Sequence, residues 1–421
     1  MIFNMYLKEC KIISRSIIYY AFIIILVLFY KSQYSNDTSS SIKQAATGNR
    51  VVSESDNYRW LNPMVEPKET DITYGKKSAE IPEQVIPRVT NILYSEYLEN
   101  SFSYYPYGFI KHKKLKESEL SKVDDIFKEI TGKTIIEVNN EIHELYLEGN
   151  NSYELPIREE LTYERFKELM TEIEEMIGPG CVYSDLSRFG TEEVTFEEAK
   201  EEYRELVEDD RFSNAFARLF SDYIGIMLAI FPVFVVTAHT LRDRKSKMQE
   251  LIFSRKASSA AIIGARYLAL TTMMFVPVLI LAIVSTVGIM NVAHSLGLSI
   301  DYFAFIKYSF VWLLPTLMVT ASVGYLIAEL TQSAVGIVVQ GALWFINLSM
   351  TPLVGGYGFS LILRHNTLGK YSIYHSRISE IIVNRGFYLL VSFGLVAITV
   401  IVYNLKRRGK WYAKRKNRKI S

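Results

Sequence analysis

Apolar residues along this 421-residue chain gather into six unevenly spaced stretches. The first covers about residues 12–30, a polar region of roughly 180 residues follows, and the other five crowd into the last half of the chain. A helix needs about 20 mainly apolar residues to cross a bilayer. We therefore predict six transmembrane helices, the last five of which lie at about 220–240, 262–290, 302–328, 334–353 and 386–403.

This spacing predicts an α-helical polytopic membrane protein with a large, mainly helical extracytoplasmic domain between transmembrane helices 1 and 2. The expected parts are the N-terminus with the first span (1–31), an acidic outer domain (32–215), a five-helix bundle (216–405) with a cytoplasmic segment (241–261), and a basic cytoplasmic tail (406–421). Apolar residues make up 49% of the chain and charged residues 22%, which suits such a protein better than a soluble enzyme.

Charged residues are segregated, and this gives the arrangement a direction. Residues 32–211 contain 21 Lys and Arg against 38 Asp and Glu, a net charge of −17, whereas the rest of the chain contains 26 basic and 7 acidic residues. Basic residues near span ends mark the cytoplasmic side. Lys8 and Lys11 precede the first span, and nine Lys or Arg lie in 406–419. We expect a multi-pass protein of the cell membrane with both termini in the cytoplasm and residues 32–215 outside.

The first apolar stretch is interpreted as an uncleaved anchor. A basic segment followed by an apolar run is also typical of a signal peptide, which remains the alternative, but residues 31–34 (KSQY) offer no small-x-small cleavage site directly after the run. The anchor places Cys10 and Cys181 on opposite sides of the membrane. We therefore expect no disulfide between them.

Helical periodicity appears in three parts of the outer domain. Apolar residues recur at three- and four-residue spacing in 120–130 and in 166–177, and both stretches end at glycine. The third stretch, 196–207, opens with Thr195 and Glu198 in the spacing of a capping box.

Two further segments of this domain are predicted to lack helix. Residues 32–91 are polar and broken by Pro63, Pro67, Pro82 and Pro87, so we expect a tether with some extended segments. Residues 134–138 (TIIEV) are predicted as a strand.

The outer domain offers no recognisable catalytic or metal site. Most of its carboxylates lie at polar positions of the predicted helices, as expected for a solvated acidic face, and the six histidines lack metal-ligand spacing. An outward-facing hydrolase on a membrane anchor would need a nucleophile and a base, and no such constellation is recognisable. We expect no enzyme activity, metal, cofactor or nucleic-acid partner for this chain.

Charged residues in or beside the five clustered spans are few. Arg218, Asp222 and Lys307 lie toward the outer ends, and Arg266 and Glu329 toward the inner ends. Arg218 and Asp222 are four residues apart, a spacing that allows them to neutralise each other. So apolar an interior argues against a small-ion pathway and fits an amphiphilic cargo, such as a peptide or lipid-like molecule.

Two features of the bundle depart from a plain series of spans. Pro232 lies in the middle of the second span and is expected to kink it. The last outer loop, 354–385, contains an excess of basic residues, against the positive-inside tendency. A re-entrant geometry would explain this excess, and so would a different topology at the C-terminal end. The basic residues concerned are Arg364, Lys370, Arg377 and Arg385.

The cytoplasmic segment between the second and third spans is the most specific local signal. Residues 241–256 read LRDRKSKMQELIFSRK, and Met248, Leu251 and Ile252 fall on one side of a short amphipathic stretch with charge on the other. Such a helix can insert into a groove on a cytosolic partner. A helix that binds lipid headgroups and a simple loop would fit the same residues, so all three interpretations stay open at this level.

The pattern Arg-Asp-Arg-x-x-x-Met-x-Glu-Leu-Ile-x-Ser-Arg at 242–255, followed by Ala-Arg-Tyr-Leu-Ala at 265–269, resembles type-2 ABC transporter permeases. One span, a large outer domain and five further spans is similar to the layout of one branch of that family. The string Tyr-Pro-Tyr-Gly-Phe at 105–109 and the Gly-rich stretch 352–358, where the family has a re-entrant hairpin, also resemble it.

The resemblance implies a permease subunit of an ATP-driven exporter. In such a complex a separate ABC ATPase subunit binds ATP and magnesium, the cytoplasmic segment docks on it with Glu250 at the place of a family Glu, and a second permease chain, identical or not, completes the unit. A membrane sensor or immunity protein, whose outer domain binds a ligand without transport, is the alternative. The residues expected to carry the coupling are Arg242, Asp243, Arg244, Met248, Glu250, Leu251, Ile252 and Arg255.

Overall fold

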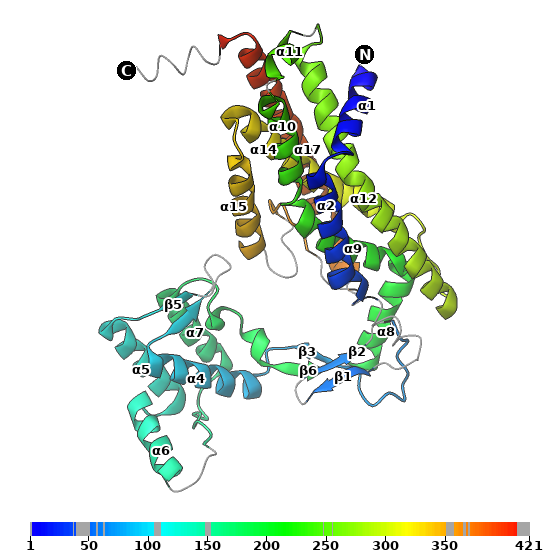
Figure 1. The fold of residues 1–421 in the computed structure, drawn as a ribbon. Coiled ribbons are helices and arrows are strands. Elements are labelled where there is room, and N and C mark those ends of the chain that lie inside the picture. Colours follow the sequence, from blue (N-terminus) through cyan, green and yellow to red (C-terminus); the bar gives the residue numbers. More distant parts are fainter. Residues whose placement is uncertain are drawn as a thin grey trace, which may run out of the picture. The chain divides into compact units, whose positions relative to one another are not determined.

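The computed structural model folds the chain into two compact units (Figure 1). The first comprises Met1–Val52, Asn62–Pro67 and Lys200–Ser421, and the second comprises Ser53–Leu61 and Lys68–Ala199. The second unit falls within the predicted outer domain, whose side of the membrane stays a prediction. The structure describes residues 2–36, 38, 51–55, 58–61, 64–104, 111–147, 153–246, 248–254, 256–350, 358–364, 368 and 371–410.

The first unit consists of helices, several of them extended by π-helical turns. Their bounds are α1 (Ile2–Ile13), α2 (Ile17–Phe29), η1 (Tyr30–Ser35), η4 (Glu205–Asp209), α9 (Ser213–Leu228), α10 (Pro232–Lys245), α11 (Gln249–Phe253), α12 (Ser259–Leu296), α13 (Ala304–Tyr308), η5 (Ser309–Leu313), α14 (Leu314–Thr331), α15 (Val335–Met350), α16 (Tyr371–Ser376) and α17 (Ile378–Arg407).

Five stretches of the described residues are helical, long and apolar enough to cross a membrane. They match five of the six predicted spans, which confirms a polytopic helical membrane protein. The remaining predicted span, 334–353, contains α15, whose 16 described residues are about 24 Å long and so shorter than a hydrocarbon core of about 30 Å. The five stretches are Ile17–Ser35, Ser213–Arg244, Ser259–Leu296, Ala304–Thr331 and Ile378–Arg407.

The second span is interrupted at Pro232, as predicted. Helix α9 ends at Leu228 and α10 begins at Pro232, whose missing N–H is harmless at a first helical position. Side chains of α15 bond the carbonyl groups next to the break: the Gln340 amide donates to the carbonyl of Ala229 at 2.6 Å, and the Trp344 indole to that of Ile226 at 3.0 Å. Irregular backbone inside a membrane requires such internal partners.

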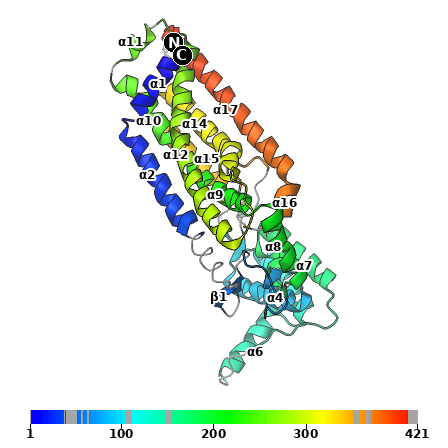
Figure 2. The same ribbon diagram turned by 90° about the vertical axis from the view of Figure 1, so that its right-hand side faces the viewer.

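Helix α14 packs against α10, α15 and α17, and it lies in the interior of the unit (Figures 1 and 2). Its contact with α10 depends on Gly324, because a Cβ atom there would lie 2.8 Å from Cγ2 of Val233. Trp312 of the adjoining π-turn η5 is 2% exposed and is among the largest fully enclosed side chains of the unit.

The chain enters α9 through a strained turn at Phe212. This residue has φ 55° and ψ −55°, and the amide of Ser213 donates to the carbonyl of Arg211 at 2.5 Å, which closes a γ-turn. A bulky residue rarely adopts this conformation unless its surroundings hold it. Here the Phe212 ring is buried 5.1 Å from that of Phe216, and the Ser213 hydroxyl both donates to and accepts from the backbone of Asp301.

The turn brings a buried acid to Arg218. Spacing alone favours Asp222 as its partner, but the carboxylate that the guanidinium contacts is that of Asp210, with two hydrogen bonds of 2.5 Å between fully buried side chains. The ring of Tyr374 lies 4.5 Å from the Arg218 guanidinium. The local i,i+4 prediction is therefore wrong for Arg218, because the γ-turn folds the preceding residues back onto α9.

A short non-helical segment, residues 358–364, lies between α15 and α16 in sequence, and its residues 361–364 are buried in the first unit. Leu361, Ile362, Leu363 and Arg364 are between 1% and 8% exposed. The Asn347 side chain accepts from the amide of Leu361 at 2.9 Å. Two of the basic residues expected in an outer loop, Arg364 and Arg385, are thus enclosed by protein rather than exposed to solvent. Residues 351–357 of the Gly-rich stretch lie outside the described residues.

The second unit has a helical core with small paired strands at its edges. Its elements are β2 (Tyr58–Leu61), β3 (Lys76–Ser78), α4 (Pro82–Glu99), β4 (Phe102–Tyr104), β5 (Lys111–Lys113), α5 (Glu117–Thr131), α6 (Ile135–Leu147), α7 (Tyr163–Ile177), η2 (Val182–Ser184), η3 (Leu186–Phe189) and β6 (Thr191–Glu193); β1 (Val51–Ser55) and α8 (Phe196–Arg204) cross the boundary between the units.

The three helices predicted from periodicity are confirmed as α5, α7 and α8. Helix α5 ends at Gly132, whose φ of 82° suits glycine. The predicted capping box of α8 is formed, because the Thr195 hydroxyl accepts from the amide of Glu198 and the Glu198 carboxylate accepts from that of Thr195. Fully buried side chains of α4, α5 and α7, among them Val85, Phe127 and Phe166, form the core.

Two predictions for the second unit are wrong. Residues 135–138 belong to α6 rather than to a strand, because Thr134 and Glu137 form a second capping box and Asp124 accepts from the amide of Ile135 at 2.7 Å. The predicted tether contains α4, since Pro82 occupies the first helical position, where proline is tolerated, and the helix continues through Pro87. The capping-box spacing of Thr134 and Glu137 and the proline at a possible helix start, Pro82, were both present in the sequence.

Candidate functional site at the 241–261 segment

The predicted coupling segment forms the short helix α11 and its flanks, at the end of the first unit that also holds the C-terminal end of α17 (Figure 2). Met248 and Leu251 are 46% and 61% exposed, and Glu250 is exposed beside them. Ile252 is half-buried and faces the unit instead. Three of the predicted residues therefore lie together on an outward surface, while Arg255 lies outside the described residues.

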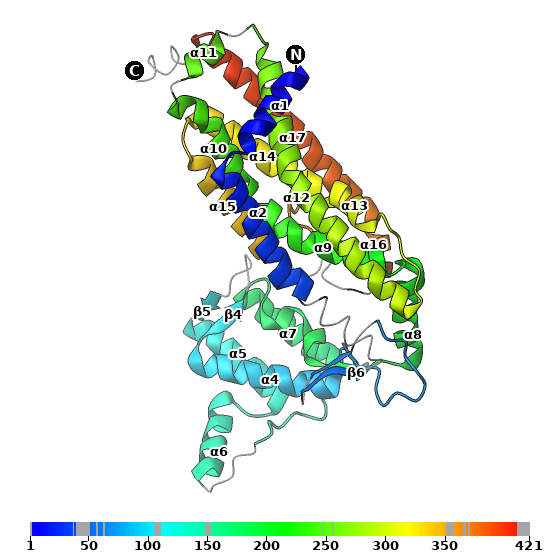
Figure 3. The same cartoon turned by 45° about the vertical axis from the view of Figure 1, so that its right-hand side comes forward.

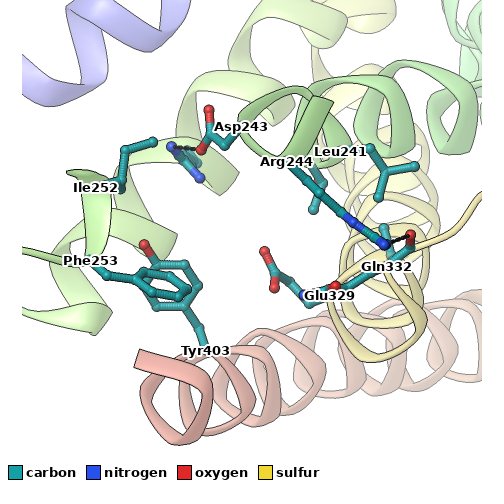
Figure 4. A pocket seen from close by; sticks show the side chains of 11 residues that line it. Leu241, Asp243, Arg244, Ile252, Phe253, Glu329, Gln332 and Tyr403 are labelled. Atoms are coloured by element: carbon teal, nitrogen blue, oxygen red, sulfur yellow. Dashed lines mark hydrogen bonds and ion pairs between the residues drawn. The ribbon is translucent and has the colours of Figure 1, made fainter. Parts of the chain in front are cut away.

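Beneath α11 lies a small polar pocket (Figure 4). Its volume is about 30 Å³, enough for one or two water molecules. The rings of Phe253 and Tyr403 meet edge to face, with their centroids 5.4 Å apart. The pocket is lined by Thr240, Leu241, Asp243, Arg244, Ile252, Phe253, Arg266, Ala328, Glu329, Gln332 and Tyr403.

Behind the pocket, a buried ion network joins three helices that are distant in sequence. Glu9 of α1 accepts from Nε of Arg266 in α12 at 3.0 Å and lies 3.0 Å from Nε2 of His239 in α10. Nη2 of Arg266 donates to the carboxylate of Asp243 in α10 at 2.5 Å. Arg242 lies 3.5 Å from Glu9 and 3.2 Å from Asp243. Each acid thus faces at least two positive or hydrogen-bonding groups.

The network keeps Glu9 ionised. Burial alone would raise the pKa of its carboxyl group, but the hydrogen bond with His239 and the charges of Arg266 and Arg242 outweigh burial and lower the pKa from 4.5 to about 2. A buried charge of this kind is tolerated only when it is paired and hydrogen-bonded. Glu9 therefore ties α1 to the base of the 241–261 segment, and Figure 3 shows α1 lying against α12.

A second ion pair closes the other side of the pocket. Nζ of Lys406 in α17 donates to the backbone carbonyl of Glu329 in α14 and lies 3.3 Å from its carboxylate. Arg244 donates to the carbonyl of Gln332 at 2.7 Å, at the C-terminal end of α14. The end of α10 is thereby held to α14.

Helix α17 also grips the backbone of the segment itself. Arg407 donates to the carbonyls of Phe253 at 2.8 Å and Ala257 at 2.6 Å, and the Ser259 hydroxyl bonds the Asn404 side chain at 3.3 Å. Movement of α11 would thus pull on α17 as well as on α10 and α12.

The structure divides the predicted residues into two groups. Met248, Glu250 and Leu251 are exposed, whereas Arg242, Asp243, Arg244 and Ile252 hold the segment to the helices beneath it. Sequence reasoning did not find Glu9, Lys406 or Arg407 as parts of this site. The available signal for Glu9 was a lone acid in an otherwise apolar and basic N-terminal stretch.

The second unit has an open groove of about 680 Å³ between α5 and α7. Arg165 lies in it and forms two hydrogen bonds with Glu129, which lower the pKa of that carboxyl group. Across the parts of the chain that the structure describes, no group of three or more His, Cys, Asp or Glu side chains could hold a metal ion. Cys10 and Cys181 are both free thiols.

Comparison with known proteins gives the family. The model of the family described as ABC-2 family transporter protein matches residues 13–403, nearly the whole chain. No curated protein and no solved structure matches it. The spans and the 241–261 segment described above fall within the matched residues, and the chain therefore belongs to the ABC-2 transporter family as a type-2 ABC transporter permease, the membrane component of an ABC transporter.

Proposed function

We propose that this chain is the permease of an ATP-driven exporter and that α11 receives the force of ATP hydrolysis from a separate ABC ATPase subunit, which holds the ATP and magnesium. The observation that carries the proposal is the pairing of an exposed surface with a buried anchorage. Met248, Glu250 and Leu251 face outward, while Asp243, through Arg266 and Glu9, ties the same segment into three helices. A loop that rests on lipid has no need of such anchorage.

The proposed topology has six spans, with α15 as the shortest. Its side chains bond the broken second span through Gln340 and Trp344, which supports a place inside the bundle. Both termini and α11 would then lie in the cytoplasm, the second unit would be extracytoplasmic, and residues 358–364 would be re-entrant. The segregation of charge, with −17 in residues 32–211, supports this orientation.

The proposed complex contains two permease chains and two ATPase subunits. Helix α17 carries large apolar side chains that are open to lipid or to a second permease, such as Leu390, Phe393 and Ile401, between 59% and 73% exposed. Several buried charges of the bundle are paired near the ends of its spans, as for Asp210 with Arg218 and Glu9 with Arg266. This leaves an apolar middle suited to an amphiphilic peptide or lipid-like cargo.

Charge reversal at the exposed acid tests the proposal. The chain is purified from its own cells in mild detergent, and the proteins that accompany it are identified by mass spectrometry. We expect an ABC ATPase with the unaltered chain and its loss with Glu250→Lys. Glu197→Lys makes the same charge change at an exposed position of α8 and should leave the ATPase bound. An ATPase that stays with Glu250→Lys would show that α11 does not dock through Glu250, and absence of any ATPase from the unaltered chain would favour a sensor or immunity protein.

A further inference from the structure

Two arginine side chains of α17, one toward each end of the helix, donate hydrogen bonds to the backbone carbonyls of other segments. At one end, Arg407 donates to the backbone carbonyls of Phe253 and Ala257 in the 241–261 segment. About two turns from the other end, Arg385 donates to the backbone carbonyls of Ser360 at 3.3 Å and Leu361 at 3.2 Å. Each arginine thus holds the backbone of another segment to α17.

Arg385 makes more hydrogen bonds than Arg407. Arg385 is 3% exposed, and its guanidinium also donates to the carbonyl of Trp312 at 3.2 Å and to the hydroxyl of Thr316 at 2.8 Å. Asn384 donates to the carbonyls of Gly358 and Ser360.

One turn further along, the Tyr388 hydroxyl donates to the carbonyl of Phe359 at 2.6 Å. Asn384, Arg385 and Tyr388 of α17 therefore bind the backbone of residues 358–361, which is not helical.

The helix between the two arginines is continuous. Residues 385 and 407 are separated by about 33 Å along a helix that rises 1.5 Å per residue, close to the thickness of a hydrocarbon core of about 30 Å. Helix α17 contains no proline, whereas the second span is broken at Pro232 and α12 contains Pro277. Proline is a common cause of sharp helix kinks, and α17 therefore lacks that cause.

We propose that α17 is a rigid link across the membrane, which carries movement of the 241–261 segment to the non-helical segment 358–364. Arg407 and Arg385 are its positioning residues, one toward each end. This inference rests on the proposed function, because it needs an ATPase that moves α11. It adds which helix takes up that movement and which part of the far side responds.

A cysteine at Gly358 reports on the far end. A Cβ atom at Gly358 meets nothing within 4 Å, and the position is exposed. The two native cysteines are replaced by serine, and the Gly358→Cys chain is purified with its ATPase and placed in lipid nanodiscs. The rate of its reaction with a maleimide is measured without nucleotide and with ATP plus vanadate. We expect a nucleotide-dependent change in this rate.

Two pairs of variants test the link. Arg407→Gln should abolish the nucleotide-dependent change, while Arg408→Gln, at the exposed neighbouring position, should keep it. Gly394→Pro bends α17 between the two arginines and should also abolish the change. Gly394→Ala should keep it, because an added Cβ meets nothing within 4 Å.

Each outcome has a distinct meaning. Variants Arg407→Gln and Gly394→Pro that retain both the ATPase and the nucleotide response would overturn the link while leaving the proposed function intact. So would an unaltered parent that binds the ATPase but shows no nucleotide response at Gly358→Cys. Absence of the ATPase from the parent would overturn the proposed function, and the link with it. Monodisperse elution of each variant in gel filtration separates these results from misfolding.

Discussion

Replacing Glu9 by glutamine should loosen α1 from the bundle. Glutamine has nearly the shape of the protonated glutamic acid, so the cost of the substitution follows from the cost of protonating Glu9 in the folded protein. The pKa of Glu9 is lowered from 4.5 to about 2, and each pH unit corresponds to about 1.4 kcal/mol, so the charge contributes roughly 3 kcal/mol. The Glu9 side chain is only 14% exposed, so little of this is lost to screening by solvent.

Hydrogen exchange measured by mass spectrometry on peptides of α1 gives the opening free energy of this helix directly. At pH 7 we expect exchange on the order of 100-fold faster in Glu9→Gln than in the unaltered chain. Lys8→Gln alters an exposed neighbour on the same helix and should change the rate little. Exchange in Glu9→Gln within threefold of the parent would refute the argument that this carboxylate anchors α1.

The same pair of proteins should differ in their pH dependence. Because the folded pKa of Glu9 lies below its ordinary value, its contribution is fully present above about pH 4.5 and is lost as the pH falls toward 2. After correction for the intrinsic exchange rate, protection of α1 in the parent should fall over this window, and the variant should lack that component. The groups that face Glu9 are Arg266, Arg242 and His239, and the two arginines stay charged throughout.

Three further substitutions test other contacts. Asp210→Asn leaves the buried Arg218 without its acid and should lower the free energy of unfolding by about 3–5 kcal/mol, seen as a lower thermal transition in detergent; an unchanged transition would contradict a buried pair. Gly324→Val should separate α10 from α14, because even a Cβ would lie 2.8 Å from Cγ2 of Val233, and cysteine crosslinking across these helices should then fall. Thr162→Ala removes the side chain that caps α7 and should lower the free energy of unfolding by about 1 kcal/mol. Urea unfolding of the full chain, followed by far-UV circular dichroism, measures this, and no loss would contradict the cap.

Some of the site could be predicted from the sequence and some could not. The segment that contains Met248, Glu250 and Leu251 was found because a short amphipathic run between two apolar spans is a local pattern. The division between exposed and anchoring residues was not, because Leu251 and Ile252 are adjacent in sequence. Only the tertiary fold separates them, since Ile252 lines the pocket beneath α11 while Leu251 is exposed.

Local chemistry was also misread in places where two local signals compete. Residues 134–138 have the composition of a strand, yet the capping box of Thr134 and Glu137 starts a helix there, since it satisfies backbone amides that a helix start otherwise leaves free. At Arg218, in contrast, the local signal does not decide the contact. Its i,i+4 neighbour Asp222 is the local choice, and a γ-turn at Phe212, invisible in the sequence, brings Asp210 to it instead.

By itself the sequence determined the apolar spans, the acidic region between the first two of them, and the position of the 241–261 segment. These follow from composition and periodicity over short windows, because a membrane span or an amphipathic helix responds mainly to its own residues and its solvent. Only the tertiary structure decided that Glu9 meets Arg266, and that α17 binds the backbone of the 241–261 segment through Arg407 and that of residues 360–361 through Arg385. Such contacts join residues up to 257 positions apart, and their geometry depends on how whole helices pack, which no local spacing records.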